Sequence, residues 1–344
     1  MTQQTQHRPP QKRLKEYQKK RWVRALLIAL FWGFSLGFPG TGVAAPPTVV
    51  VSIKPIHALI AGVMAGIGKP DVLIKGGASP HATALRPSDA RRLHRAELVF
   101  WIGKDLETLL IKPIAALSAK AEVIALSTIP GIRLRPARTG GVWSDIVETT
   151  PHPKKHDGDD DHEHLHAKND MHIWLSTLNA QAIVRHAAKI LSRHDPANGS
   201  RYHENAKRVM AQLQSLHQEL IKALLPVRQR PYVVFHDSYQ YFEREFTLQP
   251  LGSLSTHEAR KPGAKRLRDL RNIMLAQKTH QNFYCVFAEP QFQPALINTL
   301  IDGTTAKAGV LDPLGARLKP SPELYFTLMR NLARDIKHCL ASTS

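Results

Sequence analysis

Histidine is the residue type whose number and placement most clearly suggest chemistry in this chain. The sequence holds 18 histidines. His81 lies in a glycine-rich loop after a predicted strand, His172 closes a long polar segment, and His236 directly follows another predicted strand. Ligands of open parallel sheets bind beyond the carboxyl ends of strands, and three histidines with one water-filled position form a common zinc site. The sequence therefore predicts a three-histidine zinc site, although a hydrogen-bonded loop histidine is the simpler interpretation of each residue alone.

The elements that must position these histidines alternate between strands and helices. In the first half, four β-branched or apolar runs predict strands at 48–53, 72–75, 98–102 and 122–125. Helices are expected between and after them, at about 55–66, 87–94, 106–119 and 178–194. In the second half, strands at 232–235, 247–251, 284–288 and 309–311 alternate with helices at 238–245, 263–279, 293–302 and 321–340. This order predicts parallel sheets with right-handed crossovers.

One long amphipathic helix is predicted between the two halves. Apolar residues recur there at three- and four-residue steps: Ala206, Val209, Met210, Leu213, Leu216, Leu220, Ile221 and Leu224. The helix should be roughly 40 Å long and end at Pro226. A long surface helix is the simpler interpretation, but its position between two β/α blocks favours a linker. We therefore expect an α/β fold of two (β/α) lobes, residues 46–197 and 227–344, joined by one long rigid α-helix over 198–226, with the metal site between the lobes.

The composition excludes several other classes of protein. Hydrophobic residues make up 43% and charged residues 22% of the 344 residues, which excludes a disordered or fibrous chain. The formal net charge of +19 first suggests nucleic acid or a membrane surface as partner. However, eight Lys or Arg and a single Glu fall within the first 24 residues, directly before the most apolar segment of the chain.

Residues 1–45 have the three parts of a signal peptide. The basic start is followed by an apolar run of 14 residues, 25–38, and then by small residues up to Ala45. A membrane-spanning helix would need about 18–20 apolar residues, so an uncleaved anchor is the less favoured alternative. Cleavage is expected after Ala44 or Ala45. Export removes the protein from cytosolic nucleic acid, so we expect no nucleic-acid partner and, in a Gram-negative source, a soluble periplasmic protein.

Several short motifs, which lie in both halves of the chain and follow the order of the family, resemble the metal-binding solute receptors of ABC transporters, and most closely the periplasmic zinc receptors of the ZnuA type. The resemblance extends from about residue 47 to 341, and its motifs are Ser88–Asp89, Asp170–Ser176, Val234–Tyr239, Phe287–Phe292 and Leu311–Gly315. It implies two (β/α) lobes joined by a rigid helix, with metal held between the lobes.

The resemblance also implies a ligand set. His81, His172 and His236 match the three zinc-binding histidines of the family. Zinc members often have Glu directly before the first histidine, where this chain has Pro80, so water, Glu289 or a loop histidine are candidates for the fourth ligand. Manganese-binding relatives have Glu at the third position. The nitrogen-rich set here favours Zn²⁺.

A histidine- and acid-rich tract precedes His172. Its histidines are His152, His156, His162, His164 and His166. Zinc receptors commonly carry such a tract, and we expect an auxiliary loop that binds zinc weakly and interchangeably; a solvated charged loop is the simpler alternative. Residues 162–166 also fit the His-Glu-x-x-His pattern of zinc proteases, but that motif requires a regular helix, which this polar tract does not predict.

The two cysteines, Cys285 and Cys339, are expected to form a disulfide, because the chain is exported and zinc members of the family carry a comparable pair. Such a bond would contribute about 2–4 kcal/mol. Two buried free thiols are the alternative.

The prediction that follows is a monomeric, non-catalytic periplasmic receptor that captures Zn²⁺ and delivers it to an inner-membrane ABC permease. One alternative is a receptor or adhesin of the same fold for manganese or another divalent metal. Another is an extracytoplasmic zinc hydrolase, since a three-histidine site with bound water can hydrolyse esters or amides.

Overall fold

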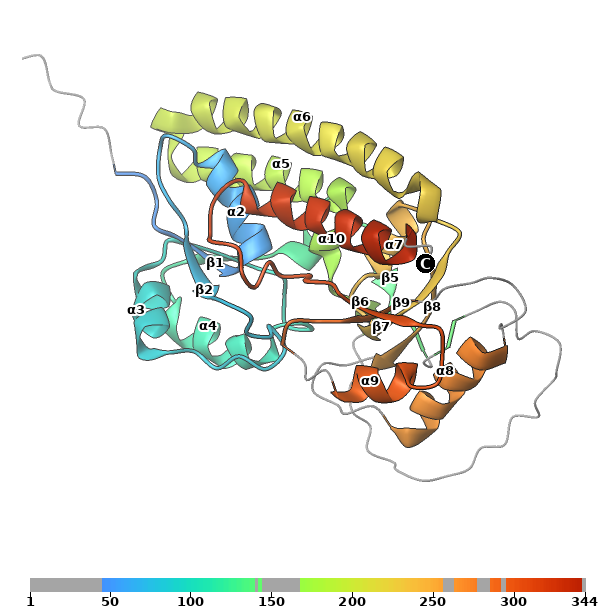
Figure 1. The fold of residues 1–344 in the computed structure, drawn as a ribbon. Coiled ribbons are helices and arrows are strands. Elements are labelled where there is room, and N and C mark those ends of the chain that lie inside the picture. Colours follow the sequence, from blue (N-terminus) through green and yellow to red (C-terminus); the bar gives the residue numbers. More distant parts are fainter. Residues whose placement is uncertain are drawn as a thin grey trace, which may run out of the picture. The chain divides into compact units, whose positions relative to one another are not determined.

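The computed structural model describes residues 45–139, 142–143, 168–255, 263–276, 285–291 and 295–341 (Figure 1). The predicted signal peptide, except Ala45, and the five loop histidines between His152 and His166 lie outside these residues. Within the described part of the chain, no helix combines the length and the apolar character needed to cross a membrane.

The first lobe is built on a four-stranded parallel sheet. Its strands are β1 (Val49–Ile53), β2 (Asp71–Ile74), β3 (Leu98–Trp101) and β4 (Glu122–Ala125), in the order β2-β1-β3-β4. The central strands β1 and β3 are buried along their whole length, as their continuous apolar sequences predict. The helices of this lobe are α2 (Lys54–Val63), α3 (Pro87–Arg95), α4 (Ile111–Leu117) and α5 (Thr177–His194). Helix α2 packs on β1 and β2, while α3 packs against α4.

The second lobe repeats this design. Its parallel sheet has the order β10-β9-β7-β8, formed by β7 (Pro231–His236), β8 (Gln249–Ser255), β9 (Cys285–Ala288) and β10 (Lys307–Val310). The helices are α7 (Gln240–Glu245), α8 (Ala264–Ala276), α9 (Ala295–Ile301) and α10 (Leu324–Ala341). Both sheets are parallel, and the predicted α/β fold with two lobes is confirmed.

The predicted linking helix is α6 (Gly199–Leu224), 26 residues long, followed by a 3₁₀ turn at Leu225–Val227 that contains Pro226. Most of the predicted apolar series is buried against α5 and α10, but Ile221 is 40% exposed. Helix α2 also approaches α6 closely: a Cβ on Gly62 would lie 2.9 Å from Cγ2 of Val209. A larger residue at position 62 would force the two helices apart.

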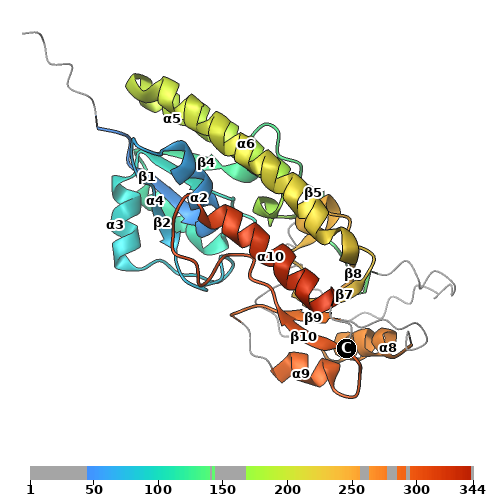
Figure 2. The same cartoon turned by 45° about the horizontal axis from the view of Figure 1, so that its top comes forward.

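Helix α10 provides a second connection between the lobes, which the sequence pattern did not predict. It packs on β10 of the second lobe and also on α2 and α6 (Figure 2). The disulfide Cys285–Cys339 joins the first residue of β9 to α10, so the expected pairing is confirmed. The C-terminal helix is therefore covalently attached to one sheet while it covers a helix of the other lobe.

Several elements differ from their predicted bounds by a few residues, and two of these differences have an identifiable reason. The helix expected over 106–119 is a 3₁₀ turn, Thr108–Leu110, followed by α4, because Pro113 has no N–H and is tolerated only in the first turn of a helix. The strand expected over 247–251 instead runs from Gln249 to Ser255. Thr247 has a φ of 57° and belongs to the turn, while Gly252 and Ser253 pair inside the sheet despite their low strand propensity.

Candidate metal centre

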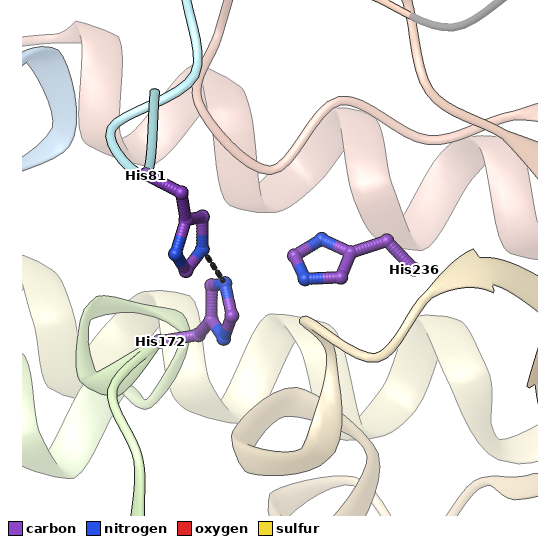
Figure 3. Close-up of side chains that lie close together, drawn as sticks. All are labelled: His81, His172 and His236. Carbon is purple, nitrogen blue, oxygen red and sulfur yellow. Dashed lines mark hydrogen bonds between the residues drawn. The ribbon is translucent and has the colours of Figure 1, made fainter. Parts of the chain in front are cut away.

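Three separate elements bring His81, His172 and His236 to one place (Figure 3). His81 lies in the loop that follows β2, and this loop begins at Gly76, whose φ of 66° suits glycine. His172 stands between the short strand β6 (Asn169–Asp170) and a 3₁₀ turn at Ile173–Leu175. His236 is the last residue of β7. The site therefore forms at the carboxyl ends of strands, where the sequence placed it.

The distances between the imidazoles suit a shared metal ion. One ligand atom from each of the three histidines lies within 4.8 Å of the others. The Nε2 atoms of His81 and His172 are 3.4 Å apart. Two nitrogens bound to one tetrahedral zinc at 2.0–2.1 Å would be about 3.3 Å apart. The described residues thus hold a preformed three-nitrogen donor set.

A carboxylate orients His172. Oδ1 of Asp170 accepts a hydrogen bond from Nδ1 of His172 at 2.7 Å and another from its backbone N–H at 2.9 Å. Both side chains are buried. With the proton held on Nδ1, the lone pair of Nε2 points toward His81, which is the tautomer that a metal requires.

A second carboxylate, that of Glu289, lies behind His236. Its Oε1 is 3.6 Å from Nδ1 of His236, and both residues are almost completely buried. Ser238 Oγ donates to Oε1 of Glu289 at 3.2 Å, and Gln291 Nε2 donates to Oε2 at 2.5 Å. Glu289 does not belong to the group of donor atoms that lie within 4.8 Å of one another. The carboxylate of Glu289 is within ion-pair distance of His236 but beyond hydrogen-bond distance, and its role as a fourth ligand stays a prediction.

His81 differs from the other two histidines in its surroundings. His172 and His236 are 7% and 2% exposed, whereas His81 is only partly buried. The loop fixes its own conformation, since the His81 backbone N–H donates to Oγ of Ser79 at 3.1 Å. The solvent-facing side of the centre is therefore the side of His81.

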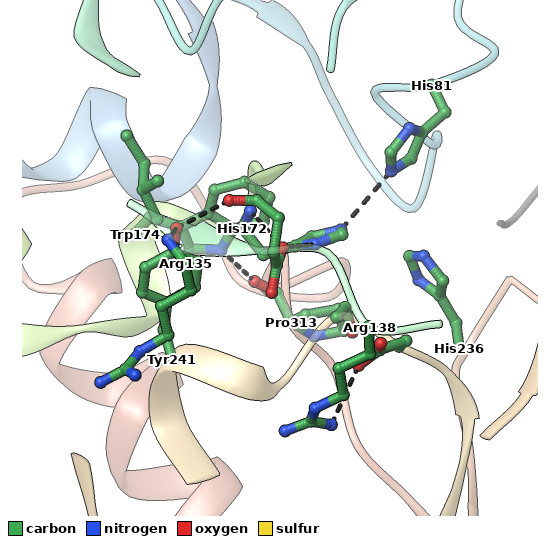
Figure 4. A network of polar contacts seen from close by, with 12 residues as sticks. His81, Arg135, Arg138, His172, Trp174, His236, Tyr241 and Pro313 are labelled. Atoms are coloured by element: carbon green, nitrogen blue, oxygen red, sulfur yellow. Dashed lines mark hydrogen bonds and ion pairs between the residues drawn. The ribbon is translucent and has the colours of Figure 1, made fainter. Parts of the chain in front are cut away.

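The segment that carries His172 is tied to the second lobe (Figure 4). Trp174 Nε1 donates to the carbonyl of Pro313 at 2.8 Å, and the Tyr325 hydroxyl donates to the carbonyl of Trp174 at 2.8 Å. The Tyr241 hydroxyl donates to the carbonyl of Asp170 at 2.7 Å. These bonds hold His172, a candidate ligand from the first lobe, at a fixed position relative to the second lobe.

A buried lysine supplies another link between the lobes. Lys54, at the start of α2, donates through Nζ to the carbonyls of Gly315, Ala316 and Leu318 in the second lobe. Burial lowers the pKa of Lys54, while the charge of Asp312 opposes this effect. Three carbonyl acceptors compensate for removing the ammonium group from water.

An ion-pair network extends from the residue after His236. Arg138 contacts Asp237 and Glu243, and its guanidinium stacks on Trp143. Burial raises the pKa of Asp237 to about 7, and the charge of Arg138 acts in the opposite direction. The same two effects act on Glu243, whose pKa is also raised. Two buried acids that share one guanidinium thus lie beside the candidate metal centre.

The sequence predicted the three histidines but not the residues that support them. The Asp-x-His spacing of residues 170–172 could have indicated the role of Asp170. An aspartate can accept a hydrogen bond from the backbone N–H two residues later in the chain. Arg138 and Asp237 are far apart in sequence, and nothing in their local pattern predicted that they would meet.

Comparison with known proteins places this architecture in a family. The family model described as zinc-uptake complex component A, periplasmic, matches residues 49–339. The chain belongs to this family. It is 39% identical over 335 residues to the high-affinity zinc uptake system protein ZnuA of Brucella suis biovar 1 (strain 1330), covering 90% of this chain and 96% of that protein.

Solved structures of the same family agree with the fold. A crystal structure of ZnuA matches with a TM-score of 0.69 and 25% identity, over 86% of this chain and 99% of that one. A zinc-bound ZnuA from which residues 138–173 (in that protein's numbering) were deleted matches with a TM-score of 0.68 and 25% identity, over 87% of this chain and 100% of that one.

Proposed function

We propose that this member of the zinc-uptake family is a periplasmic receptor that captures Zn²⁺ with His81, His172 and His236 and delivers it to an inner-membrane ABC permease. The observation that supports this most strongly is the group of three imidazole nitrogens, one from each histidine, that lie within 4.8 Å of one another and come from both lobes. The basic and apolar start of the sequence supports export. Membership of the family supports the transport role.

The choice of zinc over manganese rests on the donor atoms. Imidazole nitrogen suits zinc, whereas manganese favours carboxylate and water oxygen. The two carboxylates nearest the ligands, Asp170 and Glu289, contact the Nδ1 atoms of His172 and His236. This arrangement supports a binding role without catalysis, since these carboxylates orient ligands and are not aimed at a substrate. We propose that the receptor acts as a monomer.

A zinc titration of the mature protein against a competing chromophoric chelator tests this function. Wild type should bind one zinc tightly, and His236→Ala should lose that tight site. His203→Ala is the matched control, because His203 is an exposed histidine on α6, and it should bind like wild type. Equal affinity in all three proteins would overturn the site assignment. Tighter binding of Mn²⁺ than of Zn²⁺ would favour the manganese alternative, and hydrolysis of ester or amide substrates by the zinc-loaded protein would favour the hydrolase.

A further inference from the structure

Arg138 is the one cation that contacts two buried acids among the salt bridges of the described residues. Its Nη1 is 3.1 Å from Oδ1 of Asp237, and its Nη2 is 2.5 Å from Oε2 of Glu243. The Arg138 side chain is 11% exposed, and those of its partners are 8% and 1% exposed. Its guanidinium carbon also lies 4.1 Å from the ring centroid of Trp143. A guanidinium that binds one acid through each Nη atom and stacks on an aromatic ring is held in a single position.

The two acids fix the end of the strand that carries His236. Asp237 follows His236 directly, and its backbone N–H donates to the carbonyl of Ser255 on β8 at 3.1 Å. Glu243 belongs to α7, and its Oε1 accepts a hydrogen bond from the hydroxyl of Tyr232 on β7 at 3.1 Å. Arg138 therefore connects Asp237, the residue after β7, to the helix that follows this strand.

The chain around Arg138 also reaches the other buried histidine. Strand β5 (Arg135–Pro136) pairs with β6, and Arg135 stands opposite Asp170, the residue that orients His172. Three residues further along the chain, Arg138 binds the neighbour of His236. The backbone N–H of Trp143 then donates to the carbonyl of Leu251 on β8 at 2.7 Å. This short segment is thus attached to the supports of a first-lobe ligand and of a second-lobe ligand.

We propose that Arg138 is a positioning residue of the metal centre, which sets the separation of His172 and His236 by clamping the segment after β5 to the end of β7. The inference rests on the proposed function, because it assigns a support to the same ligands. Loss of the guanidinium would leave Asp237 and Glu243 buried without their cation. The turn after His236 would then rearrange, and the ligand nitrogen of His236 would move away from those of His81 and His172.

Two substitutions and two controls test the proposal. Arg138→Met keeps an unbranched apolar side chain without the guanidinium and its charge, and Arg138→Lys keeps the charge without the two-pronged geometry. We expect zinc affinity to fall 10- to 100-fold in Arg138→Met, the range seen when residues that support metal ligands are removed, and to fall less in Arg138→Lys. Arg330→Met removes an exposed pair with Glu219 and should change affinity less than twofold. His236→Ala reports on the ligand assignment itself.

A second readout separates positioning from a merely structural role. The visible spectrum of the Co²⁺-loaded protein reports coordination geometry and should change in Arg138→Met but not in Arg330→Met. If Arg138→Met does not fold, the double variant Arg138→Met/Glu243→Gln removes one unpaired charge and is measured instead, with the same expected loss. Wild-type affinity and Co²⁺ spectrum in a folded Arg138 variant, beside a His236→Ala that loses zinc, would overturn this proposal alone. Retention of tight zinc by His236→Ala would overturn the proposed site.

Discussion

The carboxylate of Asp170 accepts hydrogen bonds from both the Nδ1–H and the backbone N–H of His172, at 2.7 and 2.9 Å. This double contact fixes the ring and its tautomer at once, so Nε2 is ready for a metal before one arrives. Such preorganisation avoids the cost of ordering a flexible ligand during binding.

Replacing this carboxylate should weaken zinc binding without removing a ligand. We expect Asp170→Ala to lower zinc affinity about 10- to 100-fold and Asp170→Asn to lower it less, because the amide oxygen keeps an acceptor but loses the charge. Competition titration measures both. The control is Asp71→Asn, which alters an exposed carboxylate paired with Arg92 and should be neutral. An Asp170→Ala protein with unchanged affinity would show that His172 needs no support.

Substitution of a proposed ligand histidine should weaken zinc binding far more than substitution of a loop histidine. His172→Ala and His236→Ala each remove a nitrogen from a buried, fixed site, so we expect each to weaken tight zinc binding by at least about two orders of magnitude. Single changes of His152, His156, His162, His164 or His166 should cost less than threefold, because imidazoles of such a tract can replace one another. Isothermal calorimetry at equal protein concentration checks both sets. A loop histidine as costly as His236 would contradict the three-histidine site.

Deletion of residues 152–166 should leave one tight zinc site and remove only weaker ones. Asp170 has contacts of its own outside the tract, because β5 pairs with β6 and the Ala137 N–H donates to the carbonyl of Lys168 at 3.2 Å. We therefore expect Asp170 to keep its place when the tract is removed. Calorimetric stoichiometry should fall toward one zinc per chain with the tightest affinity unchanged. Loss of the tight site would make the tract part of the primary coordination.

The sequence predicted the part of this design that depends on local pattern. Continuous apolar runs such as 48–53 predicted strands of a parallel sheet that is buried on both faces. Apolar residues at three- and four-residue steps predicted α6, because a helix that is buried on one side needs apolar residues at that spacing. The disulfide also followed from there being two cysteines in a chain that is expected to be exported and resembles a family with a comparable pair. These features need no knowledge of which distant segments meet.

The features that depend on distant contacts were not predictable in this way. The packing of α10 on α2 joins residues more than 250 positions apart, and the Arg138–Asp237 pair joins two lobes. Charged residues at such positions look like ordinary surface residues in the sequence, since their burial is decided by the tertiary structure. The support of the metal centre lies mainly in contacts of this kind.

One buried acid far from the histidines should give the receptor a measurable pH dependence of stability. Glu107 is completely buried in the first lobe and accepts a hydrogen bond from the backbone N–H of Gly103 at 3.0 Å. Burial raises its pKa to about 7, although hydrogen bonds from Ser52 and from backbone groups act in the opposite direction. The folded protein therefore keeps Glu107 protonated at pH values where the unfolded chain has already released the proton.

The sign of the effect follows from proton linkage. Between about pH 4.5 and pH 7 the folded state binds one more proton at Glu107 than the unfolded state, so the free energy of unfolding falls as the pH rises. The total loss from this group is about 3 kcal/mol and is complete only above about pH 8. Glu107→Gln removes the titration while it keeps the size and hydrogen-bonding capacity of the neutral acid. The variant should thus gain stability relative to wild type as the pH increases.

Urea unfolding of the metal-free proteins at pH 5 and pH 7.5 measures this gain. We expect the difference in unfolding free energy, Glu107→Gln minus wild type, to increase by about 2 kcal/mol between the two pH values, because the other carboxylates titrate equally in both proteins and cancel. Glu204→Gln, which changes an exposed carboxylate on α6, should show a difference that does not depend on pH. A Glu107→Gln difference that is equally independent of pH would mean that Glu107 is ionised in the folded protein across this range, and that its surroundings stabilise the charge despite burial.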